Sequence, residues 1–471
     1  MIKYKNVYFI GIGGIGMSAI ARMIKTQGAK ISGSDMSESD VTRGLQELGV
    51  VVNFEQIAEN LGDESVVDNE SADEEGGSNA DVIDCVVYTT AIGDDNLELV
   101  EAKRRGLPIF KYSEMLGQLS AGMETIAVSG THGKTTTTAM ISKVFSGAGL
   151  EPHTIVGSLL PEYKSNYIKG GLVEKGGNIL ITEACEYKRS FLNLEPSHVV
   201  ITNIDEDHLD YYRNLEDIQS AFISLCEKLP EDGKIICDPD LPNLAPIVEK
   251  FGKGDGDDSK IIDYKNFLSQ VPEMKAIGEH NRLNAAAALG VVSIFIEKFY
   301  GGENSDGKVS EKKSEAKNSL KEFSGTWRRL ESRGESENGA ILYDDYAHHP
   351  DEILAGIKAL RGAFPDKKLC IFFQPHLYSR TKILFDDFVK VFSATDDEGR
   401  KYIDELFLLP IYAAREPVDL EISSEILAEK VEANFVESFE KAVEIADTKT
   451  NDSVVVTMGA GDVYKILDLM V

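Results

Sequence analysis

The chain has 471 residues, too many for one hydrophobic core, and its length predicts two to four domains. A formal net charge of −30 disfavours nucleic-acid and membrane-surface proteins, because these need a basic patch and the lysines here are scattered among acids. No apolar run approaches the roughly 20 residues that cross a bilayer, and the N-terminus has no signal-peptide cleavage pattern. The five cysteines are odd in number and lack C-x-x-C spacing, which disfavours disulfides and a cysteine zinc site, so we expect a cytoplasmic protein.

Strand-like apolar runs alternate with helical patterns along most of the chain, at residues 7–10, 86–88, 126–129, 179–182, 199–202, 369–373 and 454–457. This alternation predicts an α/β fold built on parallel sheets. We expect three domains, over residues 1–119, 120–322 and 323–471. The second boundary follows a Gly-, Ser-, Lys- and Glu-rich stretch, residues 301–321, which predicts a solvated loop or linker. Residues 63–81 are acidic and predict an exposed insertion in the first domain.

The first glycine loop follows the strand-like run 7–10. Gly11, Gly13 and Gly16 form a G-x-G-x-x-G pattern, and a helical pattern comes directly after it. Glycines in such a loop let the backbone approach a diphosphate, and the helix N-terminus supplies N–H donors. Asp35 follows a second expected strand, at the place where an acid binds ribose in dinucleotide-binding proteins. A turn that serves only close helix–strand packing is the alternative.

The second glycine loop follows the strand-like run 126–129 and precedes another helical pattern. Its Gly133-Lys134-Thr135 matches the end of a Walker A loop, but Val128 stands at the first glycine position and Gly130 supplies the flexibility. We expect the loop N–H groups and Lys134 to bind phosphates, and the Thr135 hydroxyl to face Mg²⁺. Two phosphate-binding loops on separate α/β units argue against a simple dehydrogenase.

Two polar residues follow the next expected strands, Glu183 after residues 179–182 and His208 after residues 199–202. Since the carboxyl ends of parallel strands meet at one edge of a sheet, both belong beside the second loop. Glu183 could ligate Mg²⁺, and His208 could ligate a second ion or contact phosphate, although Mg²⁺ prefers oxygen ligands. A hydrogen bond at a helix start is the alternative role for His208.

Ten motifs, taken together, resemble the Mur ligase family, and within it the members that join L-alanine to UDP-N-acetylmuramate. They keep the family's order and span nearly the whole chain, so jointly they are far more specific than either glycine loop. The motifs are GIGGIGMSAIA (11–21), SGSD (32–35), SGTHGKTTTTAM (129–140), EACEYKRSFL (183–192), TNIDEDHLDYY (202–212), GEHNRLNAAAAL (278–289), DDYAHHPDEI (344–353), FQPHLYSRT (373–381), IYAAREP (411–417) and GAGDV (459–463).

The resemblance implies an N-terminal Rossmann-like domain that binds a UDP-sugar, a central P-loop ATPase-type domain, and a C-terminal Rossmann-like domain. It implies ATP-dependent ligation of L-alanine to the lactyl carboxylate of UDP-N-acetylmuramate via an acyl-phosphate, a step of peptidoglycan precursor synthesis. The cofactors would be ATP and Mg²⁺. The partners would be these small molecules, without nucleic acid or membrane, and the protein would be a monomer or a weak homodimer.

The resemblance also implies roles for individual residues. The diphosphate of the UDP-sugar would lie on Gly13, Gly14, Ile15, Gly16, Met17 and Ser18, with Ser34 and Asp35 near the uridine. ATP would contact Gly130, Thr131, His132, Gly133, Lys134, Thr135, Thr136, Asn281, Asn284, Arg329 and Asp345, and metal would bind Thr135, Glu183 and His208. Lys134, Glu183, His208, His348 and Arg380 would act in catalysis, and His376 and Arg380 would hold the amino acid, because the Arg380 fork can bind its carboxylate through two hydrogen bonds.

Several alternatives stay open. Asn281 could only cap a helix, and Arg328 could be a surface partner of Glu331. Residues 230–278 form a shorter segment than the family usually has, which implies a trimmed central domain. A sister ligase that adds a recycled murein tripeptide to the same UDP-sugar is the nearest alternative function. A nicotinamide-dependent dehydrogenase and an inactive UDP-sugar sensor are more distant alternatives.

Overall fold

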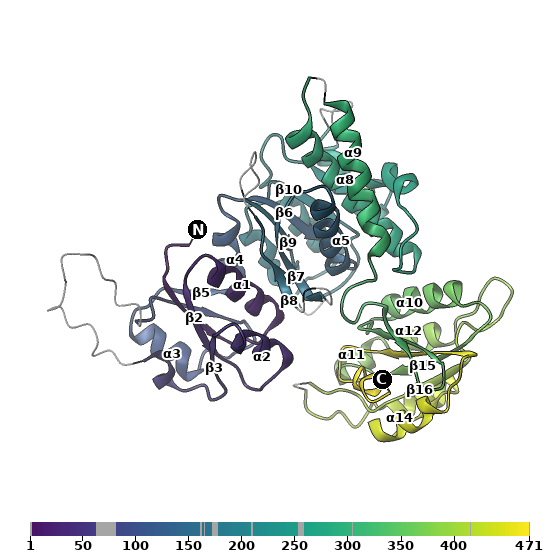
Figure 1. Ribbon diagram of the computed structural model, residues 1–471. Helices are drawn as coiled ribbons and strands as arrows, with labels where there is room; N and C mark the ends of the chain where they lie inside the picture. The colour runs from purple at the N-terminus through teal and green to yellow at the C-terminus, as the bar shows by residue number, and fades with distance from the viewer. Residues whose placement is uncertain are drawn as a thin grey trace, which may run out of the picture. The chain divides into compact units, whose positions relative to one another are not determined.

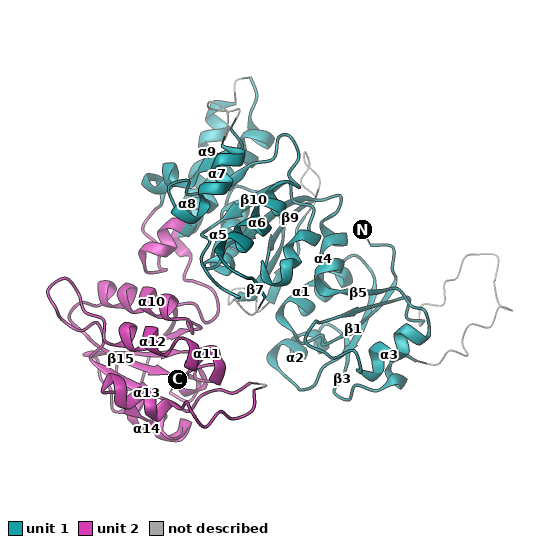
Figure 2. Cartoon of the chain, turned by 180° about the vertical axis from the view of Figure 1, so that it is seen from behind, with its two compact units in different colours: residues 1–271, 284–320 teal, residues 272–283, 321–471 magenta. Residues whose placement is uncertain are grey.

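The computed structural model describes residues 2–62, 82–160, 163, 165–171, 178–208, 211–252, 259–303, 305–414 and 416–470. The predicted insertion at 63–81 lies outside the described residues. The chain divides into two compact units, residues 1–271 with 284–320 and residues 272–283 with 321–471 (Figure 2). Three sheets with flanking helices confirm the predicted α/β class (Figure 1). The two units do not test the predicted domain boundaries after residues 119 and 322, which stay predictions.

The N-terminal sheet of the first unit is parallel, with the strand order β3-β2-β1-β4-β5. All five residues of the central β1 are buried, which accounts for its nearly unbroken apolar sequence. Because the strand order reverses beside β1, the loop after this strand opens at the crevice where such sheets bind ligands. The strands are β1 (Asn6–Ile10), β2 (Lys30–Ser34), β3 (Val51–Asn53), β4 (Cys85–Tyr88) and β5 (Ile109–Lys111), and the helices are α1 (Ile15–Thr26), α2 (Asp40–Gln46), α3 (Leu97–Arg104), α4 (Tyr112–Ser120) and the 3₁₀ helix η1 (Ala58–Leu61).

The second sheet of this unit has the order β12-β11-β10-β6-β9-β7-β8, and only β8 runs antiparallel to its neighbour among these strands. Its central strands β9, β6 and β10 are the apolar runs on which the second loop and Glu183 were placed. The strands are β6 (Glu124–Ser129), β7 (His153–Leu160), β8 (Ser165–Ile168), β9 (Ile179–Glu183), β10 (His198–Ile201), β11 (Ile235–Cys237) and β12 (Ile261–Asp263). The helices are α5 (Lys134–Gly147), α6 (Leu215–Cys226), α7 (Ala245–Phe251), α8 (Glu279–Tyr300) and α9 (Asp306–Ser319), with 3₁₀ helices η3 (Tyr187–Asn193), η4 (Pro242–Leu244), η6 (Tyr264–Gln270) and η7 (Leu320–Glu322).

Helix α1 packs against β7 and β8 of the second sheet. The Asn166 amide donates to the carbonyl of Ile15 over 2.5 Å and to the Ser18 hydroxyl over 2.7 Å. The hydroxyls of Thr26 and Tyr167 lie 3.0 Å apart. These contacts hold the helix of the first glycine loop against the sheet that carries the second.

Helix α9 corrects one prediction. Residues 306–319, expected to be part of a solvated loop, form a helix that packs on α5. Ser319 donates to the carbonyl of Lys143 over 3.1 Å, and Ala316 and Leu320 are buried. The segment 230–278, expected to be trimmed, adds β11 and the edge strand β12 to the sheet. Helix α8 is long and apolar enough to cross a membrane by length and composition, but most of its apolar stretch is buried as in a core helix.

The second unit contains one sheet with the order β13-β14-β18-β15-β16-β17, in which β13 is antiparallel to β14 and the other pairs are parallel. Alternate side chains of β15 enter two apolar cores: Ile371 and Phe373 lie in one, and Phe372 in the other. The strands are β13 (Glu331–Glu335), β14 (Ile341–Asp345), β15 (Lys368–Phe373), β16 (Glu405–Leu408), β17 (Asn434–Phe435) and β18 (Ser453–Met458). The helices are α10 (Pro350–Ala363), α11 (Tyr378–Ile383), α12 (Phe385–Phe392), α13 (Ser424–Val431), α14 (Phe439–Asp447) and α15 (Lys465–Asp468).

Candidate active site

The first glycine loop is a tight turn between β1 and α1. Gly11 has a φ of +81°, and the N–H groups of Gly11 and Ile12 both donate to the carbonyl of Ser34. A Cβ on Gly16 would come within 2.6 Å of the Tyr112 ring, so only glycine allows this close approach. The helix then begins at Ile15 without a side-chain cap, which leaves the first N–H groups of α1 for a ligand.

The two residues predicted near the uridine shape this loop in the structure. The Asp35 carboxylate accepts the N–H of Gly13 over 2.7 Å and the N–H of Met36 over 2.8 Å. The Ser34 hydroxyl donates to the buried Glu98 over 2.5 Å, so its side chain has a structural partner. The uridine contacts of Ser34 and Asp35 stay predictions, as do the diphosphate contacts of Gly13 to Ser18.

The second glycine loop is hydrogen-bonded to the segment that follows β10. The N–H of Thr131 donates to the Asn203 carbonyl over 3.1 Å, and the N–H of His132 donates to the Asn203 side chain over 2.9 Å. A Cβ on Gly130 would lie 2.0 Å from the Thr202 hydroxyl, and Gly130 and Gly133 have φ values of +134° and +84°. Asn203 was not predicted as a site residue, although it stands in the TNIDEDH motif.

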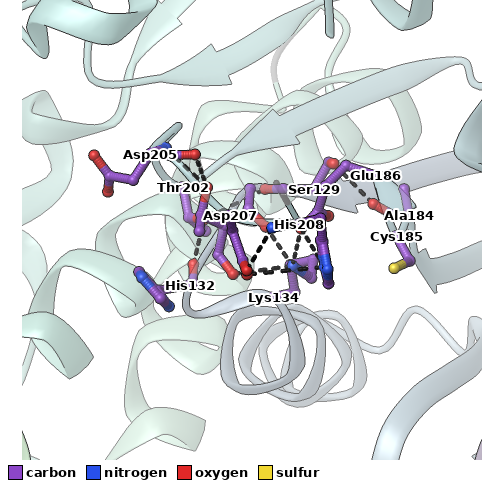
Figure 3. A network of polar contacts seen from close by, with 12 residues as sticks. Ser129, His132, Lys134, Ala184, Cys185, Glu186, Thr202, Asp205, Asp207 and His208 are labelled. Carbon is purple, nitrogen blue, oxygen red and sulfur yellow. Dashed lines mark hydrogen bonds and ion pairs between the residues drawn. The ribbon is translucent and has the colours of Figure 1, made fainter. Parts of the chain in front are cut away.

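Lys134 starts α5 and bends back over the loop (Figure 3). Its ammonium donates to the carbonyls of Gly130 and Thr131 over 2.5 and 3.0 Å and to Glu186 over 3.0 Å. Burial would lower the pKa of Lys134, but the negative charge of Glu186 beside it raises the pKa above its usual value. The ammonium is therefore charged, and its contact with phosphate oxygens stays a prediction. Thr135 and Thr136 lie in the same turn of α5 and are largely buried.

Glu183 ends β9 and faces the first glycine loop. It accepts the N–H of Gly157 over 2.5 Å and lines a cavity of about 280 Å³ together with Gly16, Tyr112 and Cys185. The structure thus brings Glu183 and the start of α1 to one cavity, although these residues lie more than 160 positions apart in the sequence.

His208 lies with two carboxylates that were not predicted as site residues. Its Nε2 is 3.8 Å from Glu186 and 3.8 Å from Asp207, and one ligand atom from each of these three residues lies within 4.8 Å of the others (Figure 3). The backbone of His208 has a φ of +54°, an uncommon value for a residue with a side chain. The acids around His208 had an alternative interpretation as helix N-terminal charge; Asp207 instead lies against the imidazole.

Asn281 and Asn284, two of the predicted ATP contacts, lie in different units. Asn284 lies beside the second loop, because a Cβ on Gly133 would come within 3.0 Å of its side-chain oxygen. Asn281 belongs to the second unit, and its amide donates to the carbonyl of Ile277 over 2.7 Å. In this bond the side chain donates to a carbonyl, so it is not the helix cap left open for Asn281, and contact of either residue with adenine stays a prediction.

The second unit brings His348, His376 and Arg380 together. The rings of His348 and His376 lie 6.0 Å apart between centroids, and Arg380 Nη1 is 3.2 Å from His376 Nδ1. Burial, with the charge of Arg380, lowers the pKa of His376 to about 4. His348 Nδ1 lies 3.0 Å from the carbonyl of Tyr346, which can only accept, so Nδ1 carries the proton and Nε2 is left as the acceptor.

Asp345 and Arg329 lie at the end of β14, close to Glu352. Burial raises the pKa of Asp345 to about 7, with Glu352 adding to the rise and Arg329 opposing it. Arg329 lies 3.8 Å from Glu352 and 5.0 Å from the centroid of the Tyr346 ring. The two predicted ATP contacts of this unit are therefore neighbours.

Arg328 corrects the sequence interpretation of a surface residue. Its side chain is buried and forms an ion pair with Asp344 over 2.8 Å, and it also donates to the carbonyls of Gly459 and Gly461. Glu331 accepts the Arg328 backbone N–H. The GAGDV motif thus serves, at least in part, to hold this arginine.

A lysine-bearing phosphate loop, a second glycine loop on a neighbouring sheet and a carboxylate between them define a nucleotide-dependent enzyme that acts on a second phosphorylated compound. Three family models match the chain in order: Mur ligase family, catalytic domain (residues 6–123), Mur ligase middle domain (128–292) and Mur ligase, glutamate ligase domain (328–461). The chain belongs to the Mur ligase family, whose members are ATP-dependent.

Known proteins are similar to this chain over nearly its full length. UDP-N-acetylmuramate–L-alanine ligase of Clostridium kluyveri is 37% identical, over 99% of this chain and 98% of that protein. The protein of the same name from Aquifex aeolicus is 38% identical, over 98% and 96%. Among solved structures, UDP-N-acetylmuramate–alanine ligase from Thermotoga maritima has a TM-score of 0.73 at 23% identity over 99% of this chain and 98% of that one. A murein peptide ligase from Psychrobacter arcticus has a TM-score of 0.63 at 19% identity, over 99% and 98%. These two likenesses show the fold.

Proposed function

We propose that the chain joins L-alanine to the lactyl carboxylate of UDP-N-acetylmuramate at the expense of ATP, giving UDP-N-acetylmuramoyl-L-alanine, ADP and phosphate. The observation that carries the proposal is the cavity shared by Gly16 and Glu183. A nucleotide sugar bound by the first loop would extend along this cavity toward the strand end that leads to Glu186 and Lys134. The names of the relatives, alanine ligases over their whole length, support the same reaction.

The reaction has two steps. A lactyl carboxylate oxygen attacks the γ-phosphorus of ATP, the bond to ADP breaks, and an acyl-phosphate forms. The alanine amine then attacks the acyl carbon, phosphate leaves, and the amine loses a proton. Because no covalent bond to the protein is needed, the residues act by binding and positioning. Lys134 and the N–H groups of the first turn of α5 would offset the charge that gathers as these anions meet.

The second unit would handle the amino acid. The Arg380 guanidinium can bind the alanine carboxylate through two hydrogen bonds. Burial lowers the pKa of His348, and its Nε2 is the acceptor of the ring, so His348 could take the proton from the alanine ammonium. His376, neutral with Nδ1 facing Arg380, would present an N–H donor instead.

Magnesium fits the donors of the first unit. Thr135, Glu183 and His208 were predicted as ligands, and Glu186 and Asp207 add carboxylate oxygens beside His208, which are the ligands that Mg²⁺ prefers. When bound, Mg²⁺ would offset negative charge on the transferring phosphoryl group. We also propose a cytoplasmic location and a monomer or weak homodimer; all five cysteines are free thiols, as a reducing compartment requires.

The test is phosphate release from ATP in the presence of UDP-N-acetylmuramate, with and without L-alanine. We expect release that depends on both compounds, with an amide product of matching mass. Adding murein tripeptide in competition with L-alanine addresses the sister ligase, and preferential use of the tripeptide would reject the alanine assignment. Binding of NAD(H) without ATP turnover would instead favour a dehydrogenase.

A further inference from the structure

A buried carboxylate, Glu186, stands opposite the catalytic lysine. Its side chain is 3% exposed, and Oε1 lies 3.0 Å from the ammonium of Lys134. Oε2 is buried without a hydrogen-bond partner in the described part of the chain. A half-satisfied buried carboxylate costs stability, so its presence needs a reason other than folding.

Three hydrogen bonds hold the backbone around this residue, two of them at Ala184 and one at Glu186 itself. The N–H of Ala184 donates to the carbonyl of Val128 over 2.9 Å, and the Ser129 hydroxyl donates to the carbonyl of Ala184 over 2.8 Å. The phenol of Tyr212 donates to the carbonyl of Glu186 itself over 2.5 Å. Ala184, two residues before Glu186, is therefore bonded to β6, the strand that leads into the phosphate loop, and Tyr212 holds the carbonyl of Glu186. Glu186 cannot move away from Lys134 without straining or breaking these contacts.

The lysine needs such a fixed partner. Its ammonium sits on four flexible carbons and has three hydrogens, which the carbonyls of Gly130 and Thr131 and the Glu186 carboxylate occupy. The carboxylate is the one charged partner of the three, and charge-assisted bonds are about twice as strong as neutral ones. A phosphate would therefore displace a carbonyl more easily than it displaces Glu186.

We propose that Glu186 is a positioning residue that holds the Lys134 ammonium at the mouth of the phosphate loop during phosphoryl transfer. The proposal rests on the proposed use of ATP at this loop. Glu186 also places a negative charge near the polyphosphate, which opposes nucleotide binding. Removing the carboxylate should therefore lower kcat without weakening ATP binding, a separation that a general loss of loop structure would not produce.

The experiment compares Glu186→Ala, Glu186→Gln and wild type. We expect Glu186→Ala to lower kcat by ~10- to 100-fold, the scale of misplacing a catalytic group by about 1 Å. The dissociation constant of ATP, measured without UDP-sugar so that nothing turns over, should be equal or lower. Glu186→Gln keeps an acceptor of the same size and should recover part of the loss. In a Lys134→Ala background, Glu186→Ala should cause no further loss, because the residue acts through the lysine.

The matched control is Glu195→Gln. Glu195 also lies 3.0 Å from a lysine ammonium, that of Lys228, but it is 60% exposed and outside the loop. This variant should keep wild-type kcat. Additive losses in the double variant, or weaker ATP binding in both Glu186 variants, would overturn the proposal, because Glu186 would then not act through Lys134. If wild type neither binds ATP nor releases phosphate, the proposed function itself fails, which is a separate outcome. If Glu186→Ala does not fold, the kcat and the ATP dissociation constant of the nearly isosteric Glu186→Gln test the proposal instead.

Discussion

Lys134 places one positive charge at the second glycine loop of a protein whose net charge is −30. We expect Lys134→Ala to lower kcat at least ~100-fold, because it removes a preorganised cation from the transferring phosphoryl group. Lys228→Ala is the matched control, since Lys228 also donates to a carbonyl and a glutamate, far from the loop in sequence and partly exposed. Steady-state kinetics of the two purified variants measure the difference. Near-normal turnover of Lys134→Ala would reject the role.

Asp345 should make the stability of the second unit depend on pH. Its pKa rises from 3.8 to about 7 on folding, so the folded carboxyl holds an extra proton between about pH 4 and pH 7. Stability from this group is present at low pH and is lost as pH rises toward 7, with a slope of up to about 1.4 kcal/mol per pH unit. Asp345→Asn should remove this slope in denaturant unfolding measured from pH 5 to pH 8.

Asp452 provides the control for that measurement. This exposed residue belongs to the same unit, but hydrogen bonds from Ser453 and Lys368 lower its pKa to about 2. It is ionised in both the folded and the unfolded chain above pH 5, so Asp452→Asn should leave the slope from pH 5 to pH 8 as in wild type. Equal slopes in wild type and Asp345→Asn would show that Asp345 titrates normally.

At the scale of elements, the turn between β6 and α5 depends on Gly130. An added methyl would lie 2.0 Å from the Thr202 hydroxyl, at a φ of +134° that other residues avoid. Gly130→Ala should therefore displace the loop, weaken ATP binding at least ~10-fold and cost about 1–3 kcal/mol of stability. Calorimetric ATP titration and thermal unfolding measure both effects.

Gly307 is the matched control for this turn. It lies in α9, nothing stands within 4 Å of an added Cβ, and alanine favours a helix. Gly307→Ala should leave ATP binding unchanged and add about 0.5–1 kcal/mol. The double variant Gly130→Ala, Thr202→Ala relieves the clash with the hydroxyl, but neither the close approach to the Asn203 backbone nor the backbone strain, so it should recover only part of the affinity. Full affinity in Gly130→Ala alone would contradict the argument.

The elements that the sequence predicted are those with a strong local signal. The apolar runs at 7–10, 126–129 and 179–182 are β1, β6 and β9, because buried parallel strands need unbroken apolar residues. Helix α9 was missed because it has no apolar face: Ala316 is its one buried residue among those described. Glycine loops were recognised because their spacing is itself the signal.

Ion pairs between residues far apart in the sequence gave no local signal of this kind. Glu186 meets Lys134 from 52 positions away, and Arg328 meets Asp344 from the turn before β13, 16 positions away. In the sequence, a buried charge looks like a surface charge, and surface is the more common place for it. Motif membership was the available clue, since Glu186 stands in EACEY and Asn203 in TNIDEDH.

At the scale of the whole molecule, the residues predicted to bind the nucleotide sugar and the amino acid lie in different units. Both glycine loops belong to the first unit, whereas His348, His376 and Arg380 belong to the second. The first unit has two sheets and the second has one, each unit with its own core, so each can respond separately to a ligand that contacts it alone. The diphosphate of a nucleotide sugar should act on the first unit and the amino acid on the second.

Hydrogen exchange can test this division. UDP-N-acetylmuramate at about 100 times its Kd should add about 2.7 kcal/mol to the opening free energy of the first unit, because a ligand that binds only the folded form stabilises it by mass action. Amides of β1, α1 and β9 should exchange more slowly, whereas those of β14 and β15 should not change. In Gly16→Ala the added Cβ would strike the Tyr112 ring, so the slowing should be lost. Equal slowing in both units would place the main sugar contacts outside the first glycine loop, because a diphosphate held there has no reason to protect the core strands of the second unit.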